Sequence, residues 1–63
     1  MVIMCEFNVF LEGEQVFEEA IYFKREDDGT LLARDILGKE KKLGNVEIEE
    51  IDVSSEKLSL SNK

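Results

Sequence analysis

In the stretch MCEFNVFL, residues 4–11, the side chains alternate between two sets of positions, and the stretch holds the only cysteine of the chain. Its first set of alternate positions is largely apolar, and its second set is mixed. The first set is Cys5, Phe7, Val9 and Leu11, and the second is Met4, Glu6, Asn8 and Phe10. A two-residue period is typical of a half-buried β-strand. We therefore predict a strand over residues 4–11 and use it as the starting point for the rest of the chain.

The length of 63 residues predicts a single domain over residues 1–63. A chain of this size buries only about 60% of the surface that its unfolded form exposes. One cysteine cannot close an internal disulfide, and without histidine a four-ligand zinc site is hard to build. We expect a homodimer to supply the missing stability, with Phe10 and the apolar residues 1–3 in the contact.

The single free thiol fits a reducing compartment, where cysteines stay unpaired. Residues 1–4 lack the basic region and the long apolar region of a signal peptide. No apolar run approaches the roughly 20 residues that span a bilayer. These features predict a cytoplasmic protein that does not enter a membrane.

Residues 15–25 are compatible with a helix or a strand. The apolar positions 16, 17, 20 and 21 fall at helical spacing, and the basic residues 24 and 25 suit a helix C-terminus. Residues 21–23 are instead rich in strand formers, and a strand here needs a bulge near Glu18 and Glu19 to keep one apolar face. The local pattern leaves both alternatives open.

Turn signals recur about every ten residues along the rest of the chain. Residues 12–14 predict a tight turn, and Asp28-Gly29 predicts a type I′ hairpin turn. Further strands are expected at residues 30–37, 40–43, 46–53 and 57–61, the 40–43 segment as a charged edge strand. The alternation slips once between Ile48 and Ile51, which predicts another bulge. Five or six short strands indicate an all-β fold, a small antiparallel barrel or sandwich.

Charge and composition limit the possible functions. The net charge of −7 disfavours RNA or DNA binding, because affinity for nucleic acid comes largely from neutralised phosphates. The one basic cluster is Lys39, Lys41 and Lys42, which suits either a solvated edge strand or a small RNA-contacting edge. Stacking partners for bases would be Phe10, Tyr22 and Phe23 if they share a surface with the lysines.

The sequence offers few residue combinations that could carry out classical catalysis. Without histidine there is no Ser–His or Cys–His pair. Adjacent acids in a strand point to opposite faces and make poor acid–base pairs. We therefore expect no enzyme activity.

Cys5 has two possible roles. A buried free cysteine usually acts as a small hydrophobic side chain, and Cys5 shares its face with Phe7, Val9 and Leu11. Its thiolate is also the softest donor in the chain, and soft donors suit late transition metals such as nickel and copper. A two-fold dimer would pair two Cys5 thiolates across its axis.

Five segments together resemble one known family. They are MCEF at residues 4–7, EGE at 12–14, RDILG at 34–38, EEIDV at 49–53, and the pair Leu58 and Leu60. The set is similar to the CooT-like family of small nickel-binding proteins, whose members are also labelled predicted RNA-binding proteins. The resemblance runs over residues 4–60.

The resemblance implies a dimeric SH3-like or Sm-like β-barrel and a strand at residues 15–25. It also implies a non-enzymatic accessory protein that assists nickel supply to a metalloenzyme such as carbon monoxide dehydrogenase. The family's metal ligand is the cysteine of an N-terminal Met-Cys pair, which corresponds to Cys5. Here residues 1–3 precede that pair. Either they separate Cys5 from the terminal amine, or the chain begins at Met4. The alternative function is an Sm-like or SH3-like module for RNA or a protein partner, with Lys39, Lys41 and Lys42 as the residues that would bind RNA.

Overall fold

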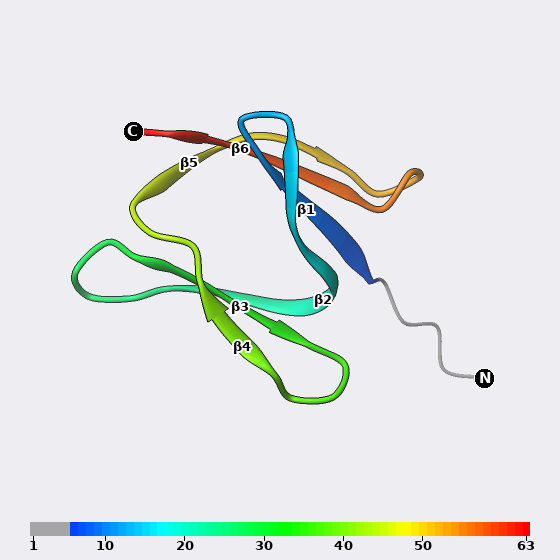
Figure 1. The fold of residues 1–63 in the computed structure, drawn as a ribbon, viewed down its shortest axis with the longest axis horizontal. Coiled ribbons are helices and arrows are strands. Elements are labelled where there is room, and N and C mark those ends of the chain that lie inside the picture. The colour runs from blue at the N-terminus through cyan, green and yellow to red at the C-terminus, as the bar shows by residue number, and fades with distance from the viewer. Residues whose placement is uncertain (1–5) are drawn as a thin grey trace.

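The computed structural model describes residues 6–63, which form six strands and no helix (Figure 1). The strands are β1 (Phe7–Leu11), β2 (Glu14–Arg25), β3 (Leu31–Asp35), β4 (Glu40–Lys42), β5 (Val46–Asp52) and β6 (Lys57–Asn62). They make one sheet in the order β4-β3-β2-β1-β6-β5, which is not closed. The all-β prediction is confirmed, whereas closure into a barrel is not.

The first and last strands of the chain pair in parallel. Val9 lies opposite Leu58, and Leu11 lies opposite Leu60, while the other four strand pairs are antiparallel. The expectation of an antiparallel sheet is therefore wrong for this pair. The reason is that β1–β6 pairing joins segments far apart in sequence, and the local alternation of each strand looks the same in either direction.

β2 is a strand of 12 residues, so the helix alternative for residues 15–25 is excluded. Its pairing with β1 shifts register between the Val9–Phe17 pair and the Phe7–Ala20 pair, and Glu19 there has a φ of 56°. This confirms the bulge expected near Glu18 and Glu19. Bulges bend a strand. β2 accordingly runs along β1 at one end and turns to run along β3 at the other (Figure 1).

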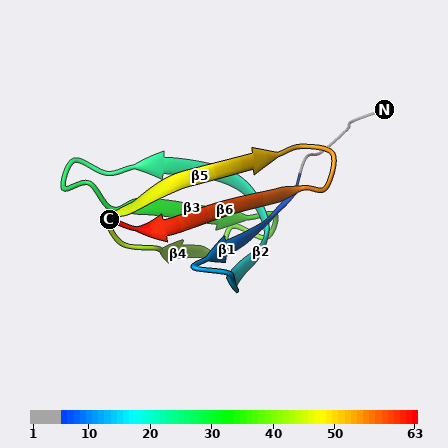
Figure 2. The same ribbon diagram turned by 90° about the horizontal axis from the view of Figure 1, so that it is seen from above.

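The bend divides the sheet into two halves that face each other (Figures 1 and 2). The meander half contains β3, β4 and the second part of β2, and the terminal half contains β1, β5 and β6. Between them lies a core of buried apolar residues: Val9, Ala20, Leu31, Ala33, Leu43, Val46, Leu58 and Leu60. Arg25 links the two halves, because its Nη1 donates to the carbonyls of Gly29, at 2.9 Å, and Val46, at 3.0 Å.

The tight turn predicted at residues 12–14 is confirmed, whereas the turn at Gly29 differs from the predicted type. Glu12 and Gly13 both have positive φ, 51° and 84°, which is the pattern of a type I′ turn. At residues 27–30 the hairpin is confirmed, but only Gly29 has positive φ, 92°. The Gly29 N–H donates to the Glu26 carbonyl at 2.9 Å, so this loop has three residues and the type I′ prediction is wrong. A type I turn followed by a left-handed glycine is the usual form of such a loop.

The predicted slip in β5 is confirmed. Ile48 lies opposite Leu60 and Ile51 lies opposite Leu58, with a register shift between Ile48 and Glu50. The extra residue returns Ile51 to the face of Ile48. Both isoleucines therefore point to the inner face of the terminal half.

Candidate functional site

The predicted metal ligand, Cys5, lies outside the described residues. The site that the structure does show is the beginning of β1, where the chain leads from Glu6 into Phe7. The Glu6 N–H donates to Oε2 of Glu56 at 3.4 Å, and the Asn8 N–H donates to the Glu56 carbonyl at 2.8 Å. The start of β1 is thus held against the turn between β5 and β6. Within residues 6–63, no group of three or more histidine, cysteine, aspartate or glutamate side chains is placed to hold a metal ion.

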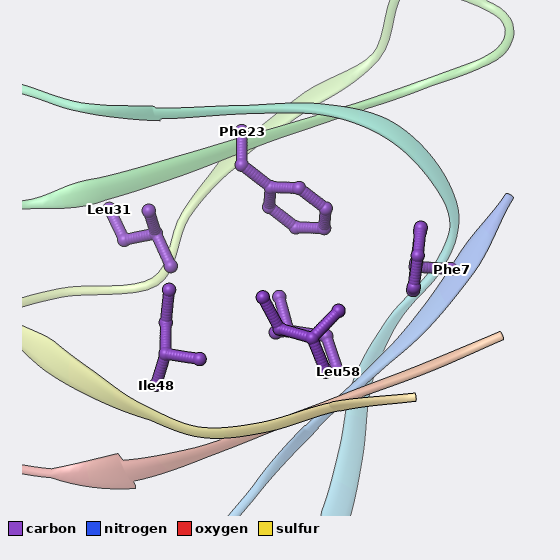
Figure 3. A pocket seen from close by; sticks show the side chains of 6 residues that line it. Phe7, Phe23, Leu31, Ile48 and Leu58 are labelled. Atoms are coloured by element: carbon purple, nitrogen blue, oxygen red, sulfur yellow. The ribbon is translucent and has the colours of Figure 1, made fainter. Parts of the chain in front are cut away.

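An apolar cavity of about 220 Å³ opens beside the same end of β1. It lies between the two halves of the sheet (Figure 3). Its lining residues are Phe7, Phe23, Leu31, Ile48, Ile51 and Leu58. In Figure 3, Phe23 and Leu31 face Ile48 and Leu58 across the space, and Phe7 lies at one side. All six side chains are apolar, so the cavity suits hydrocarbon groups rather than a charged ligand.

Two aromatic rings and two isoleucines shape this cavity. The Phe7 and Phe23 ring centroids lie 6.4 Å apart at an interplanar angle of 72°, a favourable edge-to-face arrangement. Ile48 and Ile51 are 48% and 57% exposed although they point to the inner face. Sequence reasoning did not find the cavity. The alternation of each strand gave the inward positions, but only the folding of one half over the other brings them together.

The three lysines of the predicted RNA edge do not point to one common surface. Lys39 precedes β4, and all three side chains are exposed. Neighbouring residues of a strand point to opposite faces, so Lys41 and Lys42 diverge. Lys41 Nζ donates to the Val16 carbonyl at 2.9 Å.

The outer face of the meander half places other polar groups beside Lys42. The register aligns Lys24, Leu32 and Lys42 in one row across three strands. The next row aligns Tyr22, Arg34 and Glu40. A hairpin register applied to the sequence would have found these rows.

Most of these outer-face groups already have partners. The Arg34 guanidinium lies 4.4 Å from the Tyr22 ring centroid and 2.9 Å from the Glu40 carboxylate. The other aromatics expected for base stacking lie elsewhere. Phe23 lines the cavity, and the Lys57 ammonium lies over the Phe10 ring, 5.1 Å from its centroid. The structure therefore keeps the aromatic residues in separate environments.

Two aspartates in turns have a lowered pKa. Hydrogen bonds from Thr30, the backbone N–H first, lower the pKa of Asp28 below its ordinary value of 3.8. Hydrogen bonds from Ser54 and Ser55 lower the pKa of Asp52 in the same way. Each carboxylate is held by hydrogen bonds within its own turn, and these bonds favour its ionised form in the folded protein.

The fold and the start of β1 define a class: a very small all-β domain, one bent sheet over a minimal core, with its apolar opening beside the first strand. The sequence matches the family model for the CO dehydrogenase accessory protein CooT over residues 4–61, so the chain belongs to the CooT family. The match includes Met4 and Cys5 and leaves residues 1–3 outside. No curated protein matches the sequence. Among residues 6–63, no helix is long and apolar enough to cross a membrane.

Proposed function

We propose that the protein is a non-enzymatic, cytoplasmic accessory protein that binds nickel through Cys5 and assists nickel supply to carbon monoxide dehydrogenase. The observation that carries the proposal is the CooT family match, which extends over nearly the whole chain and includes Cys5. Cys5 is the only thiol. Its thiolate is a soft donor of the kind that late transition metals accept.

The active form in this proposal is a homodimer. One thiolate per chain leaves most nickel coordination positions unfilled, and a two-fold axis supplies a second Cys5. Carboxylates stand close to the same point of the chain. Glu6 follows Cys5 directly, and Glu56 accepts a hydrogen bond from the Glu6 N–H at 3.4 Å. Backbone amides and these carboxylates are the additional donors that we propose.

A nickel titration tests the proposal. The full-length protein and a form that starts at Met4 are titrated while thiolate-to-nickel charge-transfer absorption is recorded. We expect absorption that disappears in Cys5→Ala and weakens in Glu56→Gln. Glu18→Gln, an exposed acid in β2, is the matched control and should titrate like the natural sequence. Absorption that is missing from both forms, or that is unchanged in Cys5→Ala, would contradict the proposal.

Acidity provides a second readout of the same site. Nickel binding displaces the thiol proton, and a free cysteine has a pKa of about 8.5. The apparent nickel affinity should therefore fall as the pH drops toward about 6 and below. An affinity that does not change across this range would point to oxygen ligands alone.

The second candidate is an RNA-binding module of the Sm-like or SH3-like kind. The observation that favours it is the outer row in which Lys24 and Lys42 flank Leu32, next to exposed Tyr22. Binding to single-stranded RNA should weaken steeply with salt, and charge reversal of Lys24 and Lys42 should abolish it. No binding at low salt would remove this candidate. The net charge of −7 places it second.

A further inference from the structure

The outer edge of β5 has main-chain groups that point away from the sheet. The Val46 N–H donates to the Gly44 carbonyl at 3.1 Å, and the Val46 carbonyl accepts from Arg25 Nη1 at 3.0 Å, so both groups point away from β6. Main-chain groups alternate in direction along a strand, so those of Ile48 point the same way. The extra residue of the bulge returns Ile51 to this orientation. Within residues 6–63, no strand pairs with this side of β5.

The same two isoleucines form the open wall of the apolar cavity. Leu31 and Leu58 are almost fully buried in its wall, whereas Ile48 and Ile51 are about half exposed. The mouth of the cavity therefore lies along β5. Its volume of about 220 Å³ is below the range of pockets for drug-sized ligands, about 300–1,000 Å³. Apolar side chains of a segment that pairs with the edge of β5 fit this space better than a separate small molecule.

The opposite face of β5 is acidic. Glu47, Glu49 and Glu50 are exposed, and alternation with the bulge places them on the face away from the two isoleucines. The one salt bridge within residues 6–63 joins Arg34 to Glu40, so no basic side chain of this part of the chain pairs with the three glutamates. β5 thus carries apolar side chains on one face and uncompensated negative charge on the other.

We propose that the edge of β5 binds an extended segment of a partner protein in which apolar residues alternate with lysine or arginine. The segment pairs with the main chain of Ile48 and Ile51, its apolar side chains enter the cavity mouth, and its basic side chains lie beside the glutamates. In such strand addition the main chain supplies affinity and the alternate side chains supply specificity. Cross-strand neighbours have Cβ atoms about 4.5–5.5 Å apart, close enough for opposite charges to attract. The surface does not include Cys5, so the proposal does not depend on nickel binding.

Charge favours this partner over a second copy of the chain. A second copy has a net charge of −7, and its own β5 would bring the same glutamates toward this edge. Like charges disfavour that approach. The other edge strand, β4, reads Glu40-Lys41-Lys42, so it has basic side chains but no apolar one to enter the cavity. A segment that alternates basic and apolar residues meets both requirements, and the acidic edge discourages pairing between copies.

The test is NMR of the full-length protein with a capped peptide of seven residues, the length of β5, in which valine alternates with lysine. At saturating peptide, amide hydrogen exchange of Ile48 and Ile51 should slow at least about tenfold, because their N–H groups gain partners. The Glu47 amide, which points toward β6, should not change. Nuclear Overhauser effects should join the valine methyl groups to the Phe23 ring. A peptide of the same composition with its lysines grouped together should bind at least about tenfold more weakly, because it cannot separate the two kinds of side chain onto two faces.

Charge reversal separates the edge of β5 from the general acidity of the protein. Glu47→Lys combined with Glu49→Lys should weaken binding of the alternating peptide at least about tenfold. Glu14→Lys combined with Glu18→Lys is the matched control, because it makes the same change in net charge at exposed positions of β2. The control should bind the peptide within about twofold of the natural sequence.

Four results would overturn the proposal. The first is no binding of the alternating peptide at low salt. The second is an equal loss of affinity in the two double variants. The third is binding that leaves the amide exchange of Ile48 and Ile51 unchanged. The fourth is slow exchange of these two amides in the protein without peptide, which would mean that the edge is already covered. If that protection rises with protein concentration, the edge belongs to a contact with a second copy.

Discussion

The meander half and the terminal half of the sheet bury their inward apolar side chains to different extents. On β3, the inward residues Leu31 and Ala33 are buried. On β5, Val46 is buried, but Ile48 and Ile51 are 48% and 57% exposed. Both β4 and β5 are edge strands. The difference shows that the core is complete only where the two halves face each other closely, and that its unfinished part lies beside β1, close in sequence to Cys5.

The largest expected effect distinguishes buried from open positions within the terminal half. Leu60→Ala removes a side chain that is 3% exposed and should cost about 2–4 kcal/mol of unfolding free energy. Ile51→Ala, at a half-exposed position, should cost about 1 kcal/mol. Urea unfolding followed by circular dichroism measures both. Equal losses would mean that the cavity side of β5 is packed as tightly as the core.

The turns offer a second contrast between the halves. In the meander half, Gly38 has a φ of 87°, and a Cβ added there meets nothing within 4 Å. In the terminal half, the turn after β5 places Glu56 in the left-handed region, with a φ of 54°. A non-glycine residue in that region costs about 1–2 kcal/mol, a cost that glycine avoids.

Exchanging glycine at the two turns should therefore have opposite signs. Gly38→Ala should lower the unfolding free energy by about 1 kcal/mol, and Glu56→Gly should raise it by somewhat less. The smaller gain reflects the lost hydrogen bond from the Glu6 N–H to the Glu56 side chain. Thermal unfolding of the two variants checks the signs. A destabilised Glu56→Gly would show that this side chain holds the start of β1 more strongly than its 3.4 Å hydrogen bond suggests.

The smallest effects concern pH, with one aspartate in each half. The folded state lowers the pKa of Asp28 and of Asp52 below 3.8 through hydrogen bonds in their turns. A lowered pKa stabilises the folded state above the unfolded value and loses that contribution as the pH falls through the folded value. Stability should thus drop below about pH 4. Asp28→Asn and Asp52→Asn should each reduce the difference in urea midpoint between pH 7 and pH 3.

Asp27→Asn is the matched control for the pH experiment, because Asp27 lies in the same turn as Asp28 and its side chain accepts no hydrogen bond from residues 6–63 in the structure. If all three variants reduce the midpoint difference equally, general charge repulsion rather than the turn hydrogen bonds controls the acid sensitivity.

Much of the fold was predictable because it follows from local physics. Alternation located the strands, and slips in alternation located the bulges at Glu19 and in β5. The parallel β1–β6 pair was not predictable in the same way, since it depends on contacts between the two ends of the chain. The loop around Gly29 was assigned the wrong type because Asp-Gly suits loops of two or three residues.

The candidate site was predictable in part. The family segments pointed to Cys5, and the match over residues 4–61 confirms the family. The cavity required the fold, because Phe7, Phe23 and Ile48 are far apart in sequence and no single strand pattern links them. The lysine cluster was contiguous in sequence, yet the pleat directs Lys41 and Lys42 to opposite faces.

The most direct test of the nickel proposal is X-ray absorption spectroscopy of the nickel-loaded, full-length protein at the nickel edge. The proposed dimer, with one Cys5 from each chain, predicts two sulfur ligands per nickel ion together with nitrogen or oxygen ligands. Cys5→Ala, loaded under the same conditions, should show no sulfur. A nickel ion surrounded only by nitrogen and oxygen in the natural sequence would contradict the account.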